Sequence, residues 1–307
     1  MWRARVAALI VCLAVLPLSA QVKPSDKAPP GTTVITSFDK DHTVIGWLEI
    51  FPFESKLFHN TRMLRVLVPA NYLSPHNAHR SYPVLYMQDG QNLFDQATSA
   101  HGEWHMDETV EHLVGSFKIA PIFVVGIDNA GEQRAAEYLP YPDPHNGNFS
   151  TAKSVHGDDY ARFLVTEVLP FIEKHYRVAR GPLNTGLGGS SYGADIALYT
   201  ALKYPGVFGH LLVESPLLWI GDDQLLKDAQ TAKLLPQRMY VAIGTAEIGD
   251  AAYDARAWND VEELQKTLRK KGMTTDRLRV VIEQGGEHNE SAWARRLPDA
   301  LLFLYGQ

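Results

Sequence analysis

The sequence of 307 residues contains a single cysteine, Cys12, which limits the chemistry open to the chain. Cys12 lies in an apolar run near the N-terminus, so removal of that run would leave a chain without thiols. Disulfide bridges and a thiolate nucleophile would then both be excluded. Because small exported eukaryotic domains are commonly stapled by disulfides, a cysteine-free exported chain fits a bacterial periplasm or exterior better.

Long hydrophobic runs are also scarce, and the only substantial one lies within the first twenty residues. Arg3 and Arg5 precede the uncharged stretch 6–18, and small residues follow it at Ser19 and Ala20. This layout predicts a secretory signal peptide over residues 1–20, with an uncleaved N-terminal anchor as the alternative. The run is short for a membrane span. We therefore expect a secreted or periplasmic protein with no stable membrane association after signal cleavage.

Clusters of positive charge are nearly absent from the chain. The formal charge is −6, and it becomes −8 if Arg3 and Arg5 leave with the signal peptide. The longest basic run is the triplet Arg269, Lys270 and Lys271. Nucleic acid is therefore not an expected partner.

The sequence shows no internal repeat and no linker beyond a Pro-rich start. Residues 21–39 are predicted to be a flexible lead-in, and residues 40–307 a single domain. Apolar strands alternate with amphipathic helices, which predicts an α/β fold with a mainly parallel central sheet and helices on both faces. A polar segment with Pro and Gly, 128–156, is predicted to be a binding loop or lid. Strands are expected at 44–51, 63–69, 82–87, 121–127, 185–188, 211–214, 239–243 and 278–282, with helices at 104–113, 158–175, 193–204, 257–271 and the C-terminus.

A candidate nucleophile, Ser191, occupies the centre of the sequence Gly-Ser-Ser-Tyr-Gly at 189–193. A strand is predicted before this pattern and a helix after it. A serine on such a sharp turn is lifted above the sheet, and the flanking glycines let strand and helix approach closely. The bare pattern arises by chance, so the strand–turn–helix context carries the prediction. Ser190 is flanked by glycine at only one of the two required offsets, whereas Ser191 has glycine at both.

The candidate general base is His288, which follows the last predicted strand and precedes the final helix. A hydrolase with the order serine, acid, histidine carries its base at this place. The acid is expected after strand 239–243, where Glu247 is the first choice. Asp222, Asp250 and Asp254 remain alternatives for this role.

Two backbone N–H groups are candidates for stabilising negative charge on a substrate oxygen. One belongs to Tyr192, directly after the candidate nucleophile, and the other to Gln91, after strand 82–87. The second could equally belong to an ordinary Asp-Gly turn.

Taken together, these motifs resemble the α/β-hydrolases known as "putative esterases", which include esterase D, siderophore esterases, feruloyl and acetyl-xylan esterases, and mycolyltransferases. The resemblance covers roughly residues 40–305 and implies a Ser191–Glu247–His288 triad with no cofactor. Many relatives have Leu and Gly where this chain has Tyr192 and Ala194. The matching segments are 86–94 (YMQDGQNLF), 126–129 (GIDN), Arg134 with Glu137 and Tyr138, 163–172, 188–193, 215–219 (SPLLW) and 286–288.

Other side chains are candidates for contacts with the substrate. Arg134 lies in the loop after strand 121–127, where its guanidinium could anchor an anionic or catechol-rich group. It could instead pair with Glu137 three residues on and stiffen the loop. Trp104 and Trp219 are candidate pocket walls, although large aromatics are more often core residues.

No metal site is expected from the histidines. His101, His105 and His112 have loosely metal-like spacing, but no further ligand pattern supports them.

The leading hypothesis is a serine esterase that hydrolyses a small-molecule carboxylic ester through an acyl-enzyme. Candidate substrates are a siderophore lactone, a feruloylated or acetylated sugar, or another small ester. Acyl transfer to a sugar would use the same residues, and a catalytically silent binding module is the alternative from another class. Peptidase activity is disfavoured because the sequence shows no additional domain that could select peptide chains.

Overall fold

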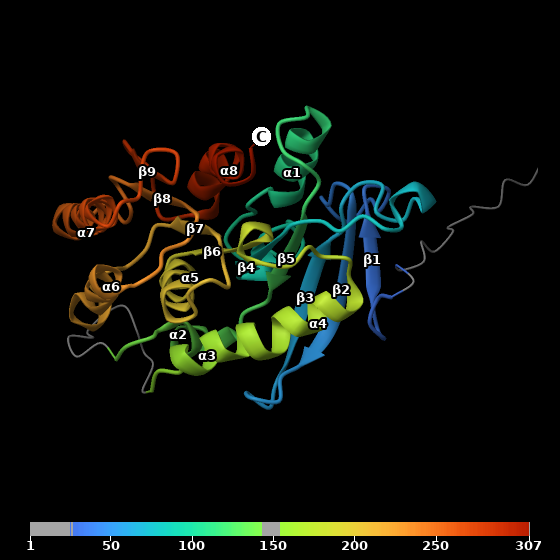
Figure 1. The fold of residues 1–307 in the computed structure, drawn as a ribbon, viewed down its shortest axis with the longest axis horizontal. Helices are drawn as coiled ribbons and strands as arrows, with labels where there is room; N and C mark the ends of the chain where they lie inside the picture. Colours follow the sequence, from blue (N-terminus) through green and yellow to red (C-terminus); the bar gives the residue numbers. More distant parts are fainter. Residues whose placement is uncertain (1–24, 26, 143–153, 307) are drawn as a thin grey trace, which may run out of the picture.

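The computed structural model describes residues 25, 27–142 and 154–306 (Figure 1). The predicted signal peptide and Cys12 lie outside these residues. The described part contains one sheet of nine strands in the order β1-β2-β3-β5-β4-β6-β7-β8-β9. The strands are β1 (Thr33–Thr36), β2 (Trp47–Glu54), β3 (Thr61–Leu67), β4 (Val84–Gln88), β5 (Phe123–Ile127), β6 (Thr185–Ser190), β7 (His210–Glu214), β8 (Arg238–Gly244) and β9 (Leu278–Glu283).

The sheet is mainly parallel, as the sequence predicts. Strands β5, β4, β6, β7, β8 and β9 pair in parallel with one another. Strands β1, β2 and β3 form an antiparallel end that joins β5. Every residue of β4, β5, β6 and β7 is buried, because helices cover both faces of these central strands.

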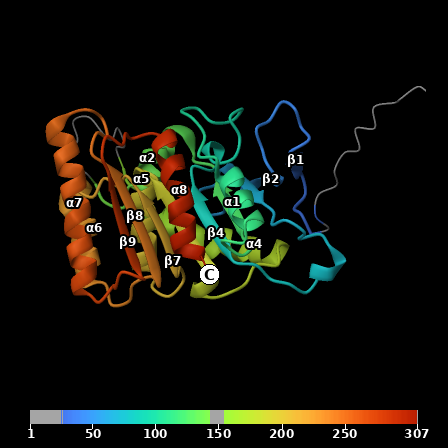
Figure 2. The same cartoon turned by 90° about the horizontal axis from the view of Figure 1, so that it is seen from above.

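Helices α1 and α8 cover one face of the sheet, and the other helices cover the opposite face (Figures 1 and 2). In β4, Leu85 and Met87 pack toward α1 and α8, whereas Val84 and Tyr86 pack into the core on the other face. This alternation follows from the two-residue period of a strand. The helices are α1 (Met106–Gly115), α2 (Arg134–Tyr138), α3 (Gly157–Phe163), α4 (Leu169–His175), α5 (Tyr192–Lys203), α6 (Ile220–Thr231), α7 (Ala251–Lys270) and α8 (Glu290–Tyr305), with a π-helical segment, Leu164–Val168, joining α3 to α4. No helix in the described ranges has both the length and the apolarity needed to cross a membrane.

The prediction of a flexible lead-in over residues 21–39 is wrong for part of this segment. Strand β1 pairs with β2 along its whole length. Ser25 is also buried, and its backbone N–H donates to Glu49 Oε1 at 2.7 Å. These contacts connect residues far apart in the sequence, so local composition does not reveal them.

Two other segments are more regular than the sequence predicts. The predicted loop 128–156 contains α2 and a short 3₁₀ turn, Gly131–Gln133, while residues 143–153 lie outside the described part. Helix α6 was not expected. Three residues near its start, Gly221, Asp222 and Asp223, lie in the left-handed region, and this Gly-Asp-Asp run has no apolar periodicity that would predict a helix.

A buried carboxyl group in α1 makes the stability of the fold depend on pH. Asp107 is fully buried, and one of its oxygens has no partner among the described residues. Burial, together with the neighbouring carboxyl group of Glu108, raises the pKa of Asp107 to about 9. A raised folded-state pKa means that the folded protein holds a proton which the unfolded chain releases, so the contribution of Asp107 to stability falls as pH rises from about 4 to about 9.

We expect Asp107→Asn to raise the melting temperature by about 3 °C or more at pH 9, with a much smaller gain at pH 5. The amide is uncharged at every pH and can donate to Glu108. Thermal unfolding followed by circular dichroism across this pH range measures the effect, with the exposed Asp41 changed to Asn as the control. Parallel curves for Asp107→Asn and the wild type would contradict the assignment.

Candidate active site

Ser191 lies on a sharp turn between β6 and α5. Its backbone angles are φ 57° and ψ −133°, a combination rare for a residue with a side chain. Its N–H donates to the carbonyl of Glu214 on β7 at 2.9 Å, and its carbonyl accepts from Ala194 and Asp195 in α5. The strain is therefore held by the sheet on one side and the helix on the other.

Glycines make this turn possible. A Cβ atom on Gly189 would lie 2.6 Å from the carbonyl oxygen of Gly193, and one on Gly193 would lie 3.0 Å from Cβ of Gln88. Only glycine at these positions lets the strand and helix approach so closely. The geometry matches what the spacing of the motif predicts.

His288 and Glu247 lie side by side, on the loops that follow β9 and β8. The Nδ1 atom of His288 is 2.5 Å from Oε2 of Glu247, and the His288 backbone N–H donates to the Glu247 carbonyl at 2.9 Å. Glu247 is almost fully buried, whereas the His288 side chain is 20% exposed. Because the carboxylate holds Nδ1, the other ring nitrogen, Nε2, faces the pocket.

The other candidate acids are engaged elsewhere. Asp250 caps α7 by accepting from the backbone N–H groups of Ala252 and Tyr253. Asp254 accepts from the N–H of Ile248, and Asp222 lies in α6. Among the described residues, only Glu247 holds the ring of His288 by a carboxylate hydrogen bond.

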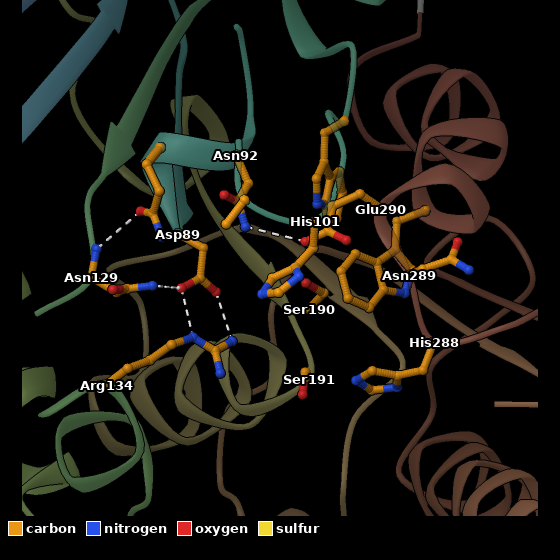
Figure 3. Close-up of a pocket in the computed structure, with 14 residues that line it drawn as sticks. Asp89, Asn92, His101, Asn129, Arg134, Ser190, Ser191, His288, Asn289 and Glu290 are labelled. Atoms are coloured by element: carbon orange, nitrogen blue, oxygen red, sulfur yellow. Dashed lines mark hydrogen bonds and ion pairs between the residues drawn. The ribbon is translucent and has the colours of Figure 1, made fainter. Parts of the chain in front are cut away.

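Ser191 and His288 line one pocket of about 690 Å³ at the carboxyl ends of the parallel strands. In Figure 3 a ring nitrogen of His288 faces the Ser191 side chain across this pocket. The hydrogen bonds of the described residues do not include one between the two side chains. Such contacts are often long before a substrate binds and shorten in the reacting complex.

The two candidate oxyanion donors lie at the expected places. Tyr192 is the first residue of α5, where backbone N–H groups point out of the helix end. Gln91 lies in a 3₁₀ turn, Gly90–Asn92, directly after β4, and it lines the pocket. No acceptor among the described residues is hydrogen-bonded to the Gln91 N–H.

Arg134 lines the same pocket, and its partner is not the predicted one. Its Nε and Nη2 atoms donate to the two carboxylate oxygens of Asp89 at 2.7 and 2.8 Å (Figure 3). Glu137 pairs instead with Arg62, through two hydrogen bonds of 2.8 and 3.0 Å. The predicted alternative of an Arg134–Glu137 pair is therefore wrong. The reason is that both glutamate oxygens point toward β3 rather than along α2.

The two candidate tryptophan walls have different locations. Trp104 is buried, lines the pocket and packs against Trp293 with ring centroids 5.6 Å apart. Trp219 instead makes a T-shaped contact with Tyr253, with ring centroids 4.9 Å apart. It is not among the described residues that line this pocket. Trp104 therefore remains a substrate-binding candidate, whereas the lining of this pocket gives no support for Trp219 in that role.

The histidines predicted not to bind metal are dispersed. His101 lines the pocket, His112 is exposed near the end of α1, and His105 precedes α1. The ligand atoms of His105, Glu103 and Glu108 come within 4.8 Å of one another. They surround the positive N-terminal end of α1, which disfavours a cation. We assign no metal to them.

Several pocket residues were not expected from the sequence. Glu290 is buried and accepts from Asn92 Nδ2 at 3.1 Å, and Asn129 donates to Asp89 at 2.7 Å. Trp293 packs edge-on against His288, with centroids 5.2 Å apart. In the sequence, Trp293 follows the candidate base by five residues and lies on the predicted final helix. This spacing is the one signal that could have identified Trp293 as a pocket residue.

Comparison with known proteins places the chain in a family. The family model described as "Putative esterase" matches residues 55–304. Uncharacterized protein YbbA of Bacillus subtilis is 26% identical over 74% of this chain and 86% of its own length. The apo-salmochelin esterase of Escherichia coli is 30% identical over 55% of this chain and 53% of its own.

A solved structure, an IroE-like serine hydrolase from Shewanella oneidensis, has a TM-score of 0.66 and 20% identity to this chain. It covers 84% of this chain, and the match spans 80% of that protein. This chain therefore belongs to the family described as "Putative esterase", and it is a carboxylic ester hydrolase with the α/β-hydrolase fold.

Proposed function

We propose that this protein hydrolyses a carboxylic ester through an acyl-enzyme, with Ser191 as nucleophile, His288 as general base and Glu247 as the orienting acid. The observation that carries the proposal is the hydrogen bond between the buried Glu247 and His288, which lines the same pocket as the strained Ser191 turn. A nucleophile, a base and a group that orients the base are the parts this chemistry needs.

The hydrogen bond to Glu247 determines which nitrogen of His288 acts as the base. Because a carboxylate accepts hydrogen bonds, it keeps the ring proton on Nδ1 and leaves the lone pair on Nε2. Nε2 takes the proton of Ser191 as Oγ bonds to the ester carbonyl carbon. The leaving alcohol receives this proton as its bond to the carbonyl carbon breaks. Water then repeats the sequence on the acyl-enzyme and regenerates Ser191.

Negative charge on the carbonyl oxygen is stabilised by the N–H groups of Tyr192 and Gln91. The first lies at the N-terminus of α5, where the helix dipole also favours an anion. Each such donor contributes about 3 kcal/mol to the transition state.

The substrate is a small ester with an anionic or catechol-bearing part, bound by Arg134. Asp89 engages Nε and Nη2 of the guanidinium, and no acceptor among the described residues is hydrogen-bonded to Nη1, which can bind a ligand. The guanidinium also lies 5.7 Å from the ring centroid of Tyr192, next to the nucleophile. The apo-salmochelin esterase among the relatives supports a siderophore ester, and a feruloylated sugar is the second candidate.

We expect Arg134→Ala to raise KM for a catechol- or carboxylate-bearing ester about 10- to 100-fold, because a charge-assisted hydrogen bond of roughly 1.5–3 kcal/mol is lost. KM for neutral nitrophenyl acetate should change less than about threefold. Steady-state kinetics on both esters measures the difference. The exposed Arg180 changed to Ala is the control. Equal losses on both esters would show that Arg134 only supports the pocket.

Export to the periplasm or the cell exterior is part of the proposal and rests on the sequence of residues 1–20.

Hydrolysis and acyl transfer differ only in whether water or another alcohol attacks the acyl-enzyme. Turnover of nitrophenyl butyrate by the wild type and by Ser191→Ala tests the proposed function. A folded wild type that turns over no ester would favour a silent binding module.

A further inference from the structure

A serine behind the site contacts the acid of the proposed triad. Ser215 directly follows β7, is fully buried, and has a φ of 46°. Its Oγ donates to Oε1 of Glu247 at 2.9 Å, while Oε2 of the same carboxylate holds His288. Oε1 also accepts from the N–H of Gly244 at 2.6 Å. Two donors therefore fix one oxygen of Glu247 and direct the other at the base.

The direction of the Ser215 hydroxyl is set by Trp293. The indole Nε1 of Trp293 lies 2.9 Å from Ser215 Oγ, and an indole N–H can only donate. Arg296 Nη2, also only a donor, lies 3.5 Å from the same oxygen. Because Ser215 Oγ accepts on these sides and carries one proton, that proton points to Glu247.

Trp293 also contacts the base itself. Its ring packs nearly perpendicular to the ring of His288, with an interplanar angle of 81°. On its other side it packs against the buried Trp104. One tryptophan thus limits the tilt of the imidazole and, through Ser215, the rotation of Glu247.

We infer that Ser215 and Trp293 are positioning residues for the reaction, a Ser215–Trp293 brace that holds Glu247 and His288 in their productive geometry. This inference rests on the proposed function. Ser215 contacts Glu247 and Trp293 and does not line the pocket in which the reaction takes place. It acts by keeping the acid–base pair aligned, since a small misplacement of catalytic groups lowers turnover steeply.

Ser215→Ala is expected to lower kcat about 10- to 100-fold, with KM changed less than about threefold, because Ser215 is buried and does not line the pocket. Serine and alanine both carry a Cβ atom, so the substitution adds no steric clash at this positive φ. Trp293→Phe, which removes the N–H and keeps an aromatic ring, should also lower kcat. It provides a second test if Ser215→Ala does not fold.

Ser55→Ala is the matched control. Ser55 lies on the loop between β2 and β3 and is also buried. Its Oγ donates to a glutamate, Glu167, at 2.8 Å. It makes the same kind of hydrogen bond as Ser215 without contacting the site. Its loss should leave kcat for nitrophenyl butyrate unchanged.

A double-mutant cycle separates positioning from general support of the fold. If Ser215 acts through Glu247, then adding Ser215→Ala to Glu247→Ala should lower kcat by less than about threefold more. Trp293→Phe should likewise have a smaller effect in that background. A further loss of tenfold or more on adding Ser215→Ala would overturn the inference.

The outcomes distinguish this inference from the proposed function. Turnover that survives Ser191→Ala would end the proposed function and the brace with it. An inactive Ser191→Ala protein combined with normal kcat in both Ser215→Ala and Trp293→Phe would end the brace alone.

Discussion

Replacing Ser191 with alanine is expected to lower kcat for nitrophenyl butyrate by at least about 10⁴-fold without unfolding the protein. Removal of a triad nucleophile costs about 10⁶-fold in a well-studied serine hydrolase, and the oxyanion donors alone sustain a small residual rate. Alanine can also occupy the turn, which needs a small residue. The kinetics are measured alongside circular dichroism spectra of both proteins.

Ser190→Ala is the comparison for this experiment. Ser190 is the last residue of β6 and lines the same pocket, but it precedes the strained turn. We expect its loss to lower kcat no more than about tenfold. Inactivation by Ser190→Ala with an active Ser191→Ala would reverse the assignment of the nucleophile.

Changing Glu247 to glutamine should lower kcat by about 10³- to 10⁴-fold, because the amide can hold His288 in the wrong tautomer. An amide NH₂ facing Nδ1 donates to it and moves the ring proton to Nε2, where it blocks proton transfer from Ser191. The Gly244 and Ser215 donors can still bind the amide oxygen. We therefore expect a folded protein, and nitrophenyl ester kinetics with thermal unfolding will check both points.

Asp250→Asn is the matched control for the acid. Asp250 caps α7, and asparagine caps helices about as well as aspartate, so neither stability nor kcat should change much. Loss of activity in Asp250→Asn, with Glu247→Gln fully active, would reassign the acid.

The parts of the fold that local patterns determine could be predicted from the sequence. Helix α7 has a regular apolar stripe of Ala257, Val261, Leu264 and Leu268, and all four are buried. The apolar stretch at β4 is buried on both faces. The Gly-Ser-Ser-Tyr-Gly turn has the strained geometry that its glycines permit.

The parts that depend on distant contacts could not be predicted. Strand β1 is held by pairing with β2, and Ser25 by Glu49, and neither contact has a local signal. Arg134 has Glu137 at helical spacing, but it pairs with Asp89, which is 45 residues earlier in the chain. Periodicity gives possible partners within an element and says nothing about partners that the fold brings from elsewhere.

The candidate site shows the same division. The positions of Ser191, Glu247 and His288 after β6, β8 and β9 follow from the order of elements, because strand ends in a parallel sheet meet at one edge. The residues that hold these side chains in place could not be predicted from the order of elements. Ser215 and Trp293 meet across 78 residues, and only the packing of α8 against β7 and β8 brings them together.

Labelling with a fluorophosphonate, followed by peptide mapping, tests directly whether Ser191 is a nucleophile activated by His288. Attack by an activated serine displaces fluoride and leaves a stable phosphonyl group on its oxygen. We predict one adduct, on Ser191, formed at least about 100-fold more slowly in His288→Ala. A folded wild type without an adduct on Ser191, or one labelled no faster than His288→Ala, would contradict it.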